Sequence, residues 1–230
     1  MKLIPEEPEG MVAECLISIG PHCRPAGQLK KNNKKRTRFP MDWLSYSAET
    51  LVHCMDTGFS DFFLEYKKEP FNGKKTQLYN FARDTRNDIM TIHNLPLDIP
   101  LDEAVHNFRR RTRDCWETFC IRMADVKSAI LFGSYSDPED ARIILHAFQE
   151  RFPNTVFRMV NISHRENCPE GEISYIKTED CFDQFYLFDK DEDVPDFWLG
   201  NENGWKTVLS FYSESGSNEE PEDLKDPVNV

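Results

Sequence analysis

The sequence predicts an α/β fold, a single domain with a mainly parallel sheet flanked by helices and with disordered termini. Three observations predict this class. The runs at residues 15–19 and 128–133 are continuously apolar, as is typical of strands buried on both faces. Helical stretches with one apolar face separate such runs. Between the strands expected at residues 128–133 and 156–162, Asp137-Pro138 starts a helix as N-cap and first helical residue, so a β-α-β unit with parallel strands is expected.

We expect three segments along the chain. Residues 1–12 are rich in Pro and Glu and are predicted to form a flexible N-terminus. Residues 13–212 contain the strand and helix patterns and are predicted to form the α/β domain, a size that one domain can reach. Residues 213–230, rich in Ser, Glu, Asp and Pro, are predicted to be a disordered acidic tail.

Charge and cysteine content exclude several classes of protein. The formal net charge of −12 argues against general nucleic-acid binding. The chain has neither a secretory signal nor an apolar run near the ~18 residues that a membrane helix needs. The seven cysteines are odd in number and form no CxxC pair, so we expect reduced thiols, no metal site and a cytoplasmic protein without a cofactor.

The segment around Cys23 combines a strand, a turn and a helix start. Gly20-Pro21 ends the strand at residues 15–19, and the next helix is expected from Pro25 to Lys31. Pro25 suits the first helical position, which places Cys23 at or just before the N-cap. The unpaired N–H groups there favour negative charge, so we expect Cys23 to favour the thiolate. The alternative is that Cys23 is a buried small apolar residue.

A basic run and an aromatic corner follow the first helix. Residues 30–38 carry six Lys or Arg and are expected to form a solvated loop or to contact a phosphate. Residues 39–43, FPMDW, predict a packed corner with Trp43 in the core and Asp42 capping the next segment. A helix then starts at Ser47 and ends at Thr57-Gly58.

The middle of the chain contains a second titratable side chain near a strand end. Residues 66–86 are predicted to be a long irregular loop, in which Asn72-Gly73 can form a hairpin turn. Residues 88–94 are predicted to be a strand that ends in His93 and Asn94. A single histidine is more often structural than functional, so the relation of His93 to Cys23 decides its role.

A long amphipathic helix is predicted from Leu101, with an apolar stripe that includes Phe108, Cys115 and Phe119. Residues 109–111, all Arg, form a cationic band on its other face. After the β-α-β unit, residues 174–176 and 185–188 predict two more strands, and residues 206–211 predict the last helix.

Taken in order, these motifs resemble the putative papain-like cysteine peptidase family DUF1796 over roughly residues 14–212. SIGPHC at residues 18–23 resembles the opening S-L-G-x-x-C of that family, and FPMDWL at 39–44 resembles its (F/P)-P-F-D-W-L. Further matches are Phe59, Phe62 and Phe63, Ile92-His93-Asn94, NFRRR at 107–111, and the pair Trp198 and Trp205. This chain departs from the family at Met41, where the family has Phe, and at Asn94, where it has Asp.

The resemblance implies a thiol-dependent amide hydrolase. Cys23 corresponds to the nucleophile and His93 to the general base, and Asp42, with Asn94 as second choice, is expected to orient the imidazole. The N–H groups near Cys23 are expected to form the oxyanion hole. The substrate is expected to be a peptide or another amide. Substrate-binding residues are expected to be His22, Arg24, Trp43, Asn94 and Arg110.

Two alternatives remain open from the sequence. The first is an anion- or nucleotide-sugar-binding, glycosyltransferase-like α/β protein in which Cys23 is structural. In such folds ligands bind beyond the carboxyl ends of strands, and the turn at residues 20–25 at a helix start suits an anion. The basic residues at 30–38 and 109–111 would supply the countercharge. The second alternative is an inactive interaction module of the same fold.

Overall fold

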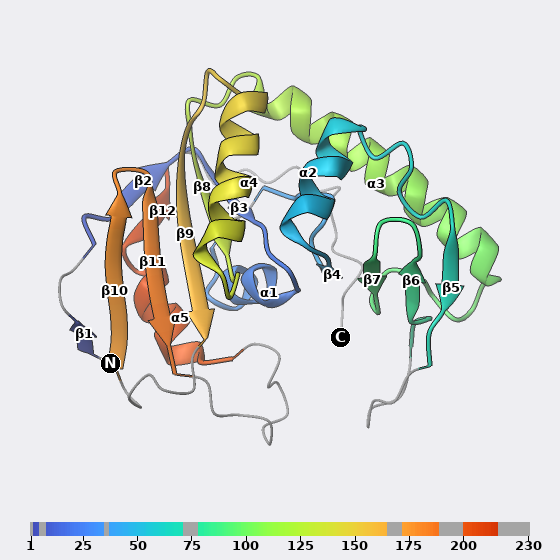
Figure 1. The fold of residues 1–230 in the computed structure, drawn as a ribbon, viewed down its shortest axis with the longest axis horizontal. Helices are drawn as coiled ribbons and strands as arrows, with labels where there is room; N and C mark the ends of the chain where they lie inside the picture. Colours follow the sequence, from blue (N-terminus) through green and yellow to red (C-terminus); the bar gives the residue numbers. More distant parts are fainter. Residues whose placement is uncertain are drawn as a thin grey trace.

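The computed structural model of the chain confirms the α/β class (Figure 1). It describes residues 2–4, 8–34, 37–70, 78–164, 172–188 and 200–215. The main sheet has six strands in the order β1 (Lys2–Ile4), β10 (Glu172–Glu179), β11 (Phe182–Leu187), β9 (Val156–His164), β8 (Ser128–Gly133) and β3 (Cys15–Ser18). Neighbouring strands from β11 to β3 are parallel, whereas β10 runs antiparallel to β11.

The predicted β-α-β unit is confirmed. Strand β8 and strand β9 are parallel, and α4 (Pro138–Arg151) connects them. The N-cap carboxylate of Asp137 accepts a hydrogen bond from the N–H of Glu139 at 2.9 Å, and Pro138 occupies the first turn. Local capping and burial of both strand faces therefore specify this unit together.

Helices cover both faces of the main sheet, and each face has its own apolar core. Side chains of β3 alternate, with Ile17 packing in the core that contains residues of α2 (Ala48–Asp56), α3 (Leu101–Met123) and α4. Leu16 packs on the opposite face, with α1 (Arg24–Lys31) and α5 (Glu202–Leu209). This double burial explains the continuous apolar runs in the sequence.

A second sheet corrects the loop predicted at residues 66–86. Four strands form it in the order β4 (Leu44–Ser45), β7 (Ile89–Thr91), β6 (Ala82–Asp84) and β5 (Tyr66–Lys68), and all are antiparallel. The strand predicted at 88–94 is thus shorter, and His93 lies two residues beyond its end. Strands of two or three residues carry too little periodicity to show in a sequence. Asn72-Gly73 lies outside the described residues.

Both ends of the described chain contain short strands. In the segment predicted to be flexible, β1 pairs with β10 and β2 (Met11–Ala13) pairs with β12 (Tyr212–Glu214). The hydroxyl of Tyr212 is buried and donates to Asp183 Oδ2 at 2.7 Å, which joins β12 to the main sheet. The folded part therefore reaches beyond residue 212. The remainder of the predicted acidic tail, residues 216–230, lies outside the described residues.

The last helix starts earlier than predicted. Asn201 is the N-cap of α5, and its side chain accepts a hydrogen bond from the N–H of Gly204 at 2.9 Å. The prediction began the helix at residue 206 because Asn203-Gly204 resembles a turn. In the described part of the chain, no helix combines the length and apolarity that crossing a membrane requires.

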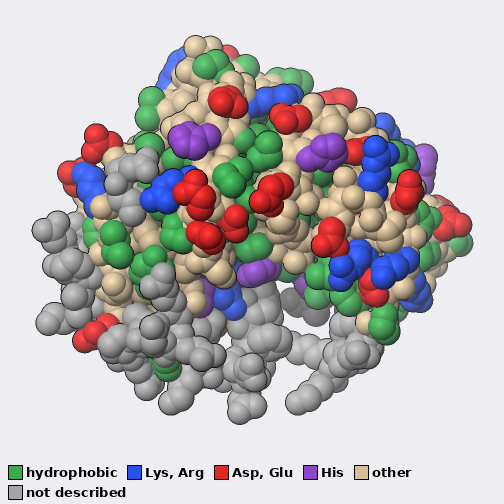
Figure 2. Space-filling view, in the orientation of Figure 1, with side chains coloured by type: hydrophobic (Ala, Val, Ile, Leu, Met, Phe, Trp, Pro, Cys, Tyr) green, Lys and Arg blue, Asp and Glu red, His purple; other side chains and the backbone are tan. Residues whose placement is uncertain are grey.

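Charges are unevenly distributed over the face shown in Figure 2. Acidic side chains gather over α2 and α4, and the negative charges of Glu49, Asp137 and Glu139 help raise the pKa of Asp140, after burial. Basic side chains gather instead over β5 and β6. Neither group lies among the predicted site residues.

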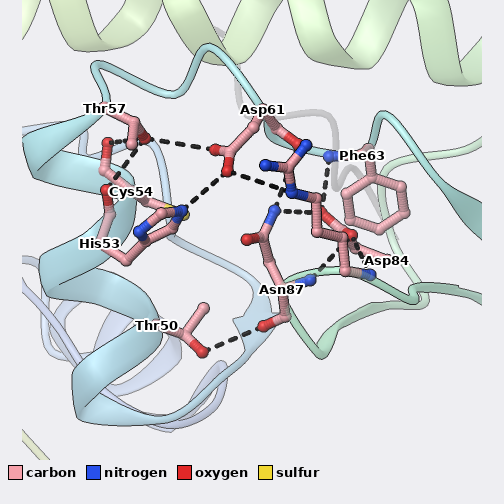
Figure 3. Close-up of polar contacts among 9 residues, drawn as sticks. Thr50, His53, Cys54, Thr57, Asp61, Phe63, Asp84 and Asn87 are labelled. Atoms are coloured by element: carbon pink, nitrogen blue, oxygen red, sulfur yellow. Dashed lines mark hydrogen bonds and ion pairs between the residues drawn. The ribbon is translucent and has the colours of Figure 1, made fainter.

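Buried carboxylates join α2 to the second sheet (Figure 3). Asp84 is fully buried and accepts hydrogen bonds from the N–H groups of Phe63 at 2.6 Å and Asn87 at 3.1 Å. Asp61 accepts from His53 Nε2 at 2.7 Å and from Thr57 Oγ1 at 3.2 Å. These bonds occupy the carboxylates, so we interpret this histidine–aspartate pair as structural.

Replacing Asp84 by Ala is expected to destabilise the fold by about 3 kcal/mol, because several buried N–H groups lose their acceptor. Urea unfolding followed by circular dichroism measures this loss. Asp88→Ala is the matched control, because Asp88 lies in the same turn with its side chain 76% exposed. An equal loss in both variants would contradict the assignment.

Candidate functional site

The candidate site lies at the carboxyl edge of the main sheet. Strand β3 ends at Ser18, β8 at Gly133 and β9 at His164, and because these strands are parallel their ends meet at one edge. The turn after β3 leads directly into α1, whose N-cap is Cys23. The predicted place of Cys23 at a helix start is therefore confirmed. Its side chain is partly exposed.

The turn between β3 and α1 is held by Tyr46. The N–H of Gly20 donates to Tyr46 Oη at 2.9 Å, and the N–H of Tyr46 donates to the carbonyl of Pro21 at 3.3 Å. A Cβ at Gly20 would lie 2.9 Å from Pro25 Cγ, so the close approach of turn and helix requires glycine. The position of Cys23 thus depends on contacts from outside its own segment.

Asp42 connects the end of β3 to the corner at residues 39–43. Ser18 Oγ donates to Asp42 Oδ1, and the N–H of Phe39 donates to Asp42 Oδ2 at 3.1 Å. Asp42 therefore bonds back to its own corner, which differs from the predicted cap on the next segment. Trp43 is 6% exposed, as predicted for a core residue, and adopts a φ of 67° that is costly for a bulky side chain.

The electrostatics of Cys23 contradict the predicted thiolate. The pKa of the Cys23 thiol is raised to about 11, chiefly by burial and to a lesser extent by the negative charge of Asp42, while a backbone hydrogen bond lowers it. The backbone N–H at the helix start therefore lowers the thiol pKa, as expected, but the loss of hydrating water raises the pKa by more. The thiol is protonated at neutral pH in this structure.

His93 contacts Trp43 and not Cys23. Its ring lies edge-on to Trp43 with centroids 6.1 Å apart and to Tyr79 at 6.5 Å. Burial lowers the pKa of His93, so its imidazole is neutral at neutral pH. Among the described residues it forms no hydrogen bond with Cys23 or Asp42. The structure thus places Asp42 within electrostatic reach of Cys23, and His93 against the neighbouring Trp43.

A second histidine near this edge was not predicted. His164 ends β9 and accepts a hydrogen bond from Trp205 Nε1 at 3.2 Å. A Cβ at Gly200 would lie 2.7 Å from His164 Cε1 and 3.1 Å from Arg24 Cζ, so these groups are closely packed. Loss of water lowers the pKa of His22, and the charges of Arg24 and His164 lower it further.

The place of His164 at the carboxyl edge of the sheet could have been predicted from the sequence. The strand at residues 156–162 was predicted to end two residues too early, and continuing it to residue 164 places a histidine at the carboxyl edge. Of the Trp pair in the family resemblance, Trp205 is fully buried and contacts His164. Trp198 lies outside the described residues.

Two pockets share Asp42 and Trp43 as a common wall. The turn pocket, a shallow hollow of about 160 Å³ including open solvent, is also lined by Ser18, His22 and Tyr46. The arginine pocket, about 400 Å³ including open solvent, lies between the corner and α3. It is lined by Arg38, Phe39, Pro40, Asp42, Trp43, Asn94, Phe108, Arg111, Thr112 and Cys115.

The predicted substrate-binding residues divide between these places. His22 lines the turn pocket, Trp43 lines both pockets, and Asn94 lines the arginine pocket. Arg24 lies beside His164. Arg110 is exposed, donates to Asn107 Oδ1 at 3.4 Å and lines neither pocket.

The neighbour of Arg110, Arg111, lines the arginine pocket instead. Phe108, Arg111, Thr112 and Cys115 follow one another at helical spacing and share a face of α3. The sequence carries this signal. If Phe108 and Cys115 are assigned to the buried face of the helix, the helical spacing places Arg111 on that face as well. Within the described residues, no group of three or more His, Cys, Asp or Glu side chains is placed to hold a metal ion.

The comparisons with known proteins gave one match. A family model described as "Putative papain-like cysteine peptidase (DUF1796)" matches residues 14–167. That span runs from the residue before β3 to just beyond β9, and includes every residue of both pockets. A search of curated proteins and a search of solved structures found no match.

Alkylation of Cys23 by iodoacetamide is expected to accelerate with pH beyond pH 10, because the thiol pKa is about 11. Asp42→Asn removes a negative charge near the thiol and should lower this pKa, which raises the rate at pH 8 severalfold. Peptide mapping by mass spectrometry separates Cys23 from the other cysteines.

Asp88→Asn, which removes an exposed charge in the second sheet, should leave the alkylation profile unchanged. A rate that reaches its plateau below the ~8.5 of a free thiol, or that ignores Asp42, would contradict this electrostatic assignment.

Proposed function

Because the chain belongs to the family of putative papain-like cysteine peptidases, we propose that it is a thiol-dependent amide hydrolase. Cys23 is the nucleophile, His93 is the general base, and the substrate is a peptide or another amide. The observation that carries this proposal is the position of Cys23 at the N-cap of α1, within the matched segment and next in sequence to His22, which lines the turn pocket.

The protonation states favour general-base catalysis over a preformed ion pair. The thiol of Cys23 is protonated at neutral pH, so its proton leaves as the sulfur attacks the carbonyl carbon. A base must be neutral to accept it, and the lowered pKa of His93 keeps its imidazole neutral. The resulting imidazolium then protonates the leaving amine, which balances the acylation step.

The proton path needs a change relative to this structure. No hydrogen bond joins His93 to Cys23 in the described residues, and catalytic hydrogen bonds often tighten only when substrate is bound. Trp43 packs against His93 and carries a strained φ of 67°, so we propose that Trp43 moves together with His93. Substrate entry into the turn pocket would displace it.

Asp42 and the start of α1 complete the proposed machinery. Ser18 and the N–H of Phe39 hold the Asp42 carboxylate, whose charge stabilises an imidazolium formed nearby. We propose that the N–H groups of Arg24 and Ala26 in the first turn of α1, where Pro25 has none, receive the developing oxyanion. The odd number of cysteines without a CxxC pair favours a reducing compartment, so we propose a cytoplasmic location.

Labelling with a peptidyl vinyl sulfone, which traps nucleophilic cysteines, tests this proposal without a known substrate. We expect modification of Cys23 in the natural protein and none at this position in Cys23→Ser. His93→Ala should slow the labelling about 100-fold, the usual contribution of a general base. His146→Ala is the matched control, because His146 is exposed on α4.

Mass spectrometry of intact and digested protein measures these rates. Labelling of Cys23 that is equally fast without His93 would overturn the assignment of the base. If the labelling rate falls only in His22→Ala or His164→Ala, the general base is one of these histidines near Arg24 and not His93.

A further inference from the structure

The arginine pocket contains two cations from distant parts of the chain. Arg38 follows the bridge between Ile17 and Thr37, and Arg111 lies in the middle of α3. Both line the same pocket, and Asp42 is the acidic residue among the lining side chains. The pocket therefore carries an excess of positive charge.

In the part of the chain that the structure describes, neither guanidinium pairs with a carboxylate. Within the described residues, Arg38 forms no hydrogen bond or ion pair, and Arg111 donates only to the carbonyl of Asn94, at 3.2 Å. The Asp42 carboxylate is instead engaged by Ser18 and the N–H of Phe39. Arg109, two residues before Arg111, also donates to a backbone carbonyl, that of Phe62 at 2.9 Å, but it does not line the pocket.

The two cations also act on each other. Loss of water lowers the pKa of Arg111, and the charges of Arg38 and Arg110 lower it further. Like charges brought together in a folded protein cost free energy unless an anion joins them. The planar donor groups of guanidinium match the two oxygens of a carboxylate or phosphate.

We propose that the arginine pocket binds a small anionic group, a carboxylate or a phosphate, between Arg38 and Arg111. Asp42 and Trp43 line both this pocket and the turn pocket, so the two sites are neighbours. The sequence suggested an anion at the turn of residues 20–25, and the structure favours the other side of Trp43. This inference does not depend on catalysis by Cys23.

Titration of the full chain with inorganic phosphate, and separately with succinate, tests the proposal at constant ionic strength. The melting temperature and the tryptophan fluorescence report binding, since Trp43 lines the pocket. We expect a saturable response in the natural protein. Arg111→Gln and Arg38→Gln should each weaken binding about tenfold or more, the loss expected for a charge-assisted hydrogen bond.

Arg110→Gln is the matched control, because it removes the adjacent charge on α3 from outside the pocket. It should retain the affinity within about twofold. Without ligand, Arg111→Gln should melt at the same temperature as the natural protein or higher, because a repulsion is removed. A purely structural Arg111 would instead lower the melting temperature and leave anion binding unchanged.

The two anions distinguish the chemical class of the ligand. Saturation by phosphate alone assigns a phosphate group, and saturation by succinate alone assigns a carboxylate. The proposal is overturned if neither anion gives a saturable response, or if Arg110→Gln loses as much affinity as Arg111→Gln. Vinyl sulfone labelling of Cys23 is a separate readout, so failure of the hydrolase proposal does not imply failure here.

Discussion

The carboxylate of Asp42 holds together the two parts of the chain that form the site. One carboxylate oxygen accepts a hydrogen bond from the hydroxyl of Ser18 at the end of β3. The other oxygen accepts a hydrogen bond from the N–H of Phe39 at the start of the corner. These bonds position Trp43, which forms the wall between the turn pocket and the arginine pocket. Removing this carboxylate would therefore change the geometry on both sides as well as the electrostatics of Cys23.

Burial, with a smaller contribution from the charge of this carboxylate, keeps the Cys23 thiol protonated. A cysteine at a helix start is usually read as activated, because the local N–H groups favour negative charge. Here burial and the charge of Asp42 act in the opposite direction and are stronger. The neutral state of His93 fits a protonated thiol, so the site has a proton donor and a proton acceptor in the forms that general-base catalysis needs.

Patterns within short stretches of sequence predicted the helix starts and the strands that are buried on both faces. Pro25, Ser47 and Asp137 identify helix starts, and the apolar runs identify the strands that are buried on both faces. The second sheet has strands of two or three residues, whose pairing depends on contacts such as those of Asp84. Such pairing leaves no periodic pattern, which explains why residues 66–86 were predicted to be a loop.

The site was predicted less completely, because its geometry depends on contacts between distant segments. The place of Cys23 at the helix start follows from Pro25, whereas its raised pKa follows from burial and from Asp42, which no spacing reveals. Arg110 was chosen within an arginine run, and only the packing of α3 shows that Arg111 faces the pocket. His164 was missed because the end of β9 was misplaced by two residues.

In this structure Cys23 is a thiol at rest and His93 is a neutral imidazole. Nuclear magnetic resonance titration of the ¹³Cβ of Cys23 and the ring carbons of His93, followed in one sample, measures both states. We expect His93 to titrate below the ~6.5 of a free imidazole and Cys23 to titrate near 11. A thiolate at pH 6 to 7, with an imidazolium that persists above pH 8, would contradict this expectation and establish an ion pair.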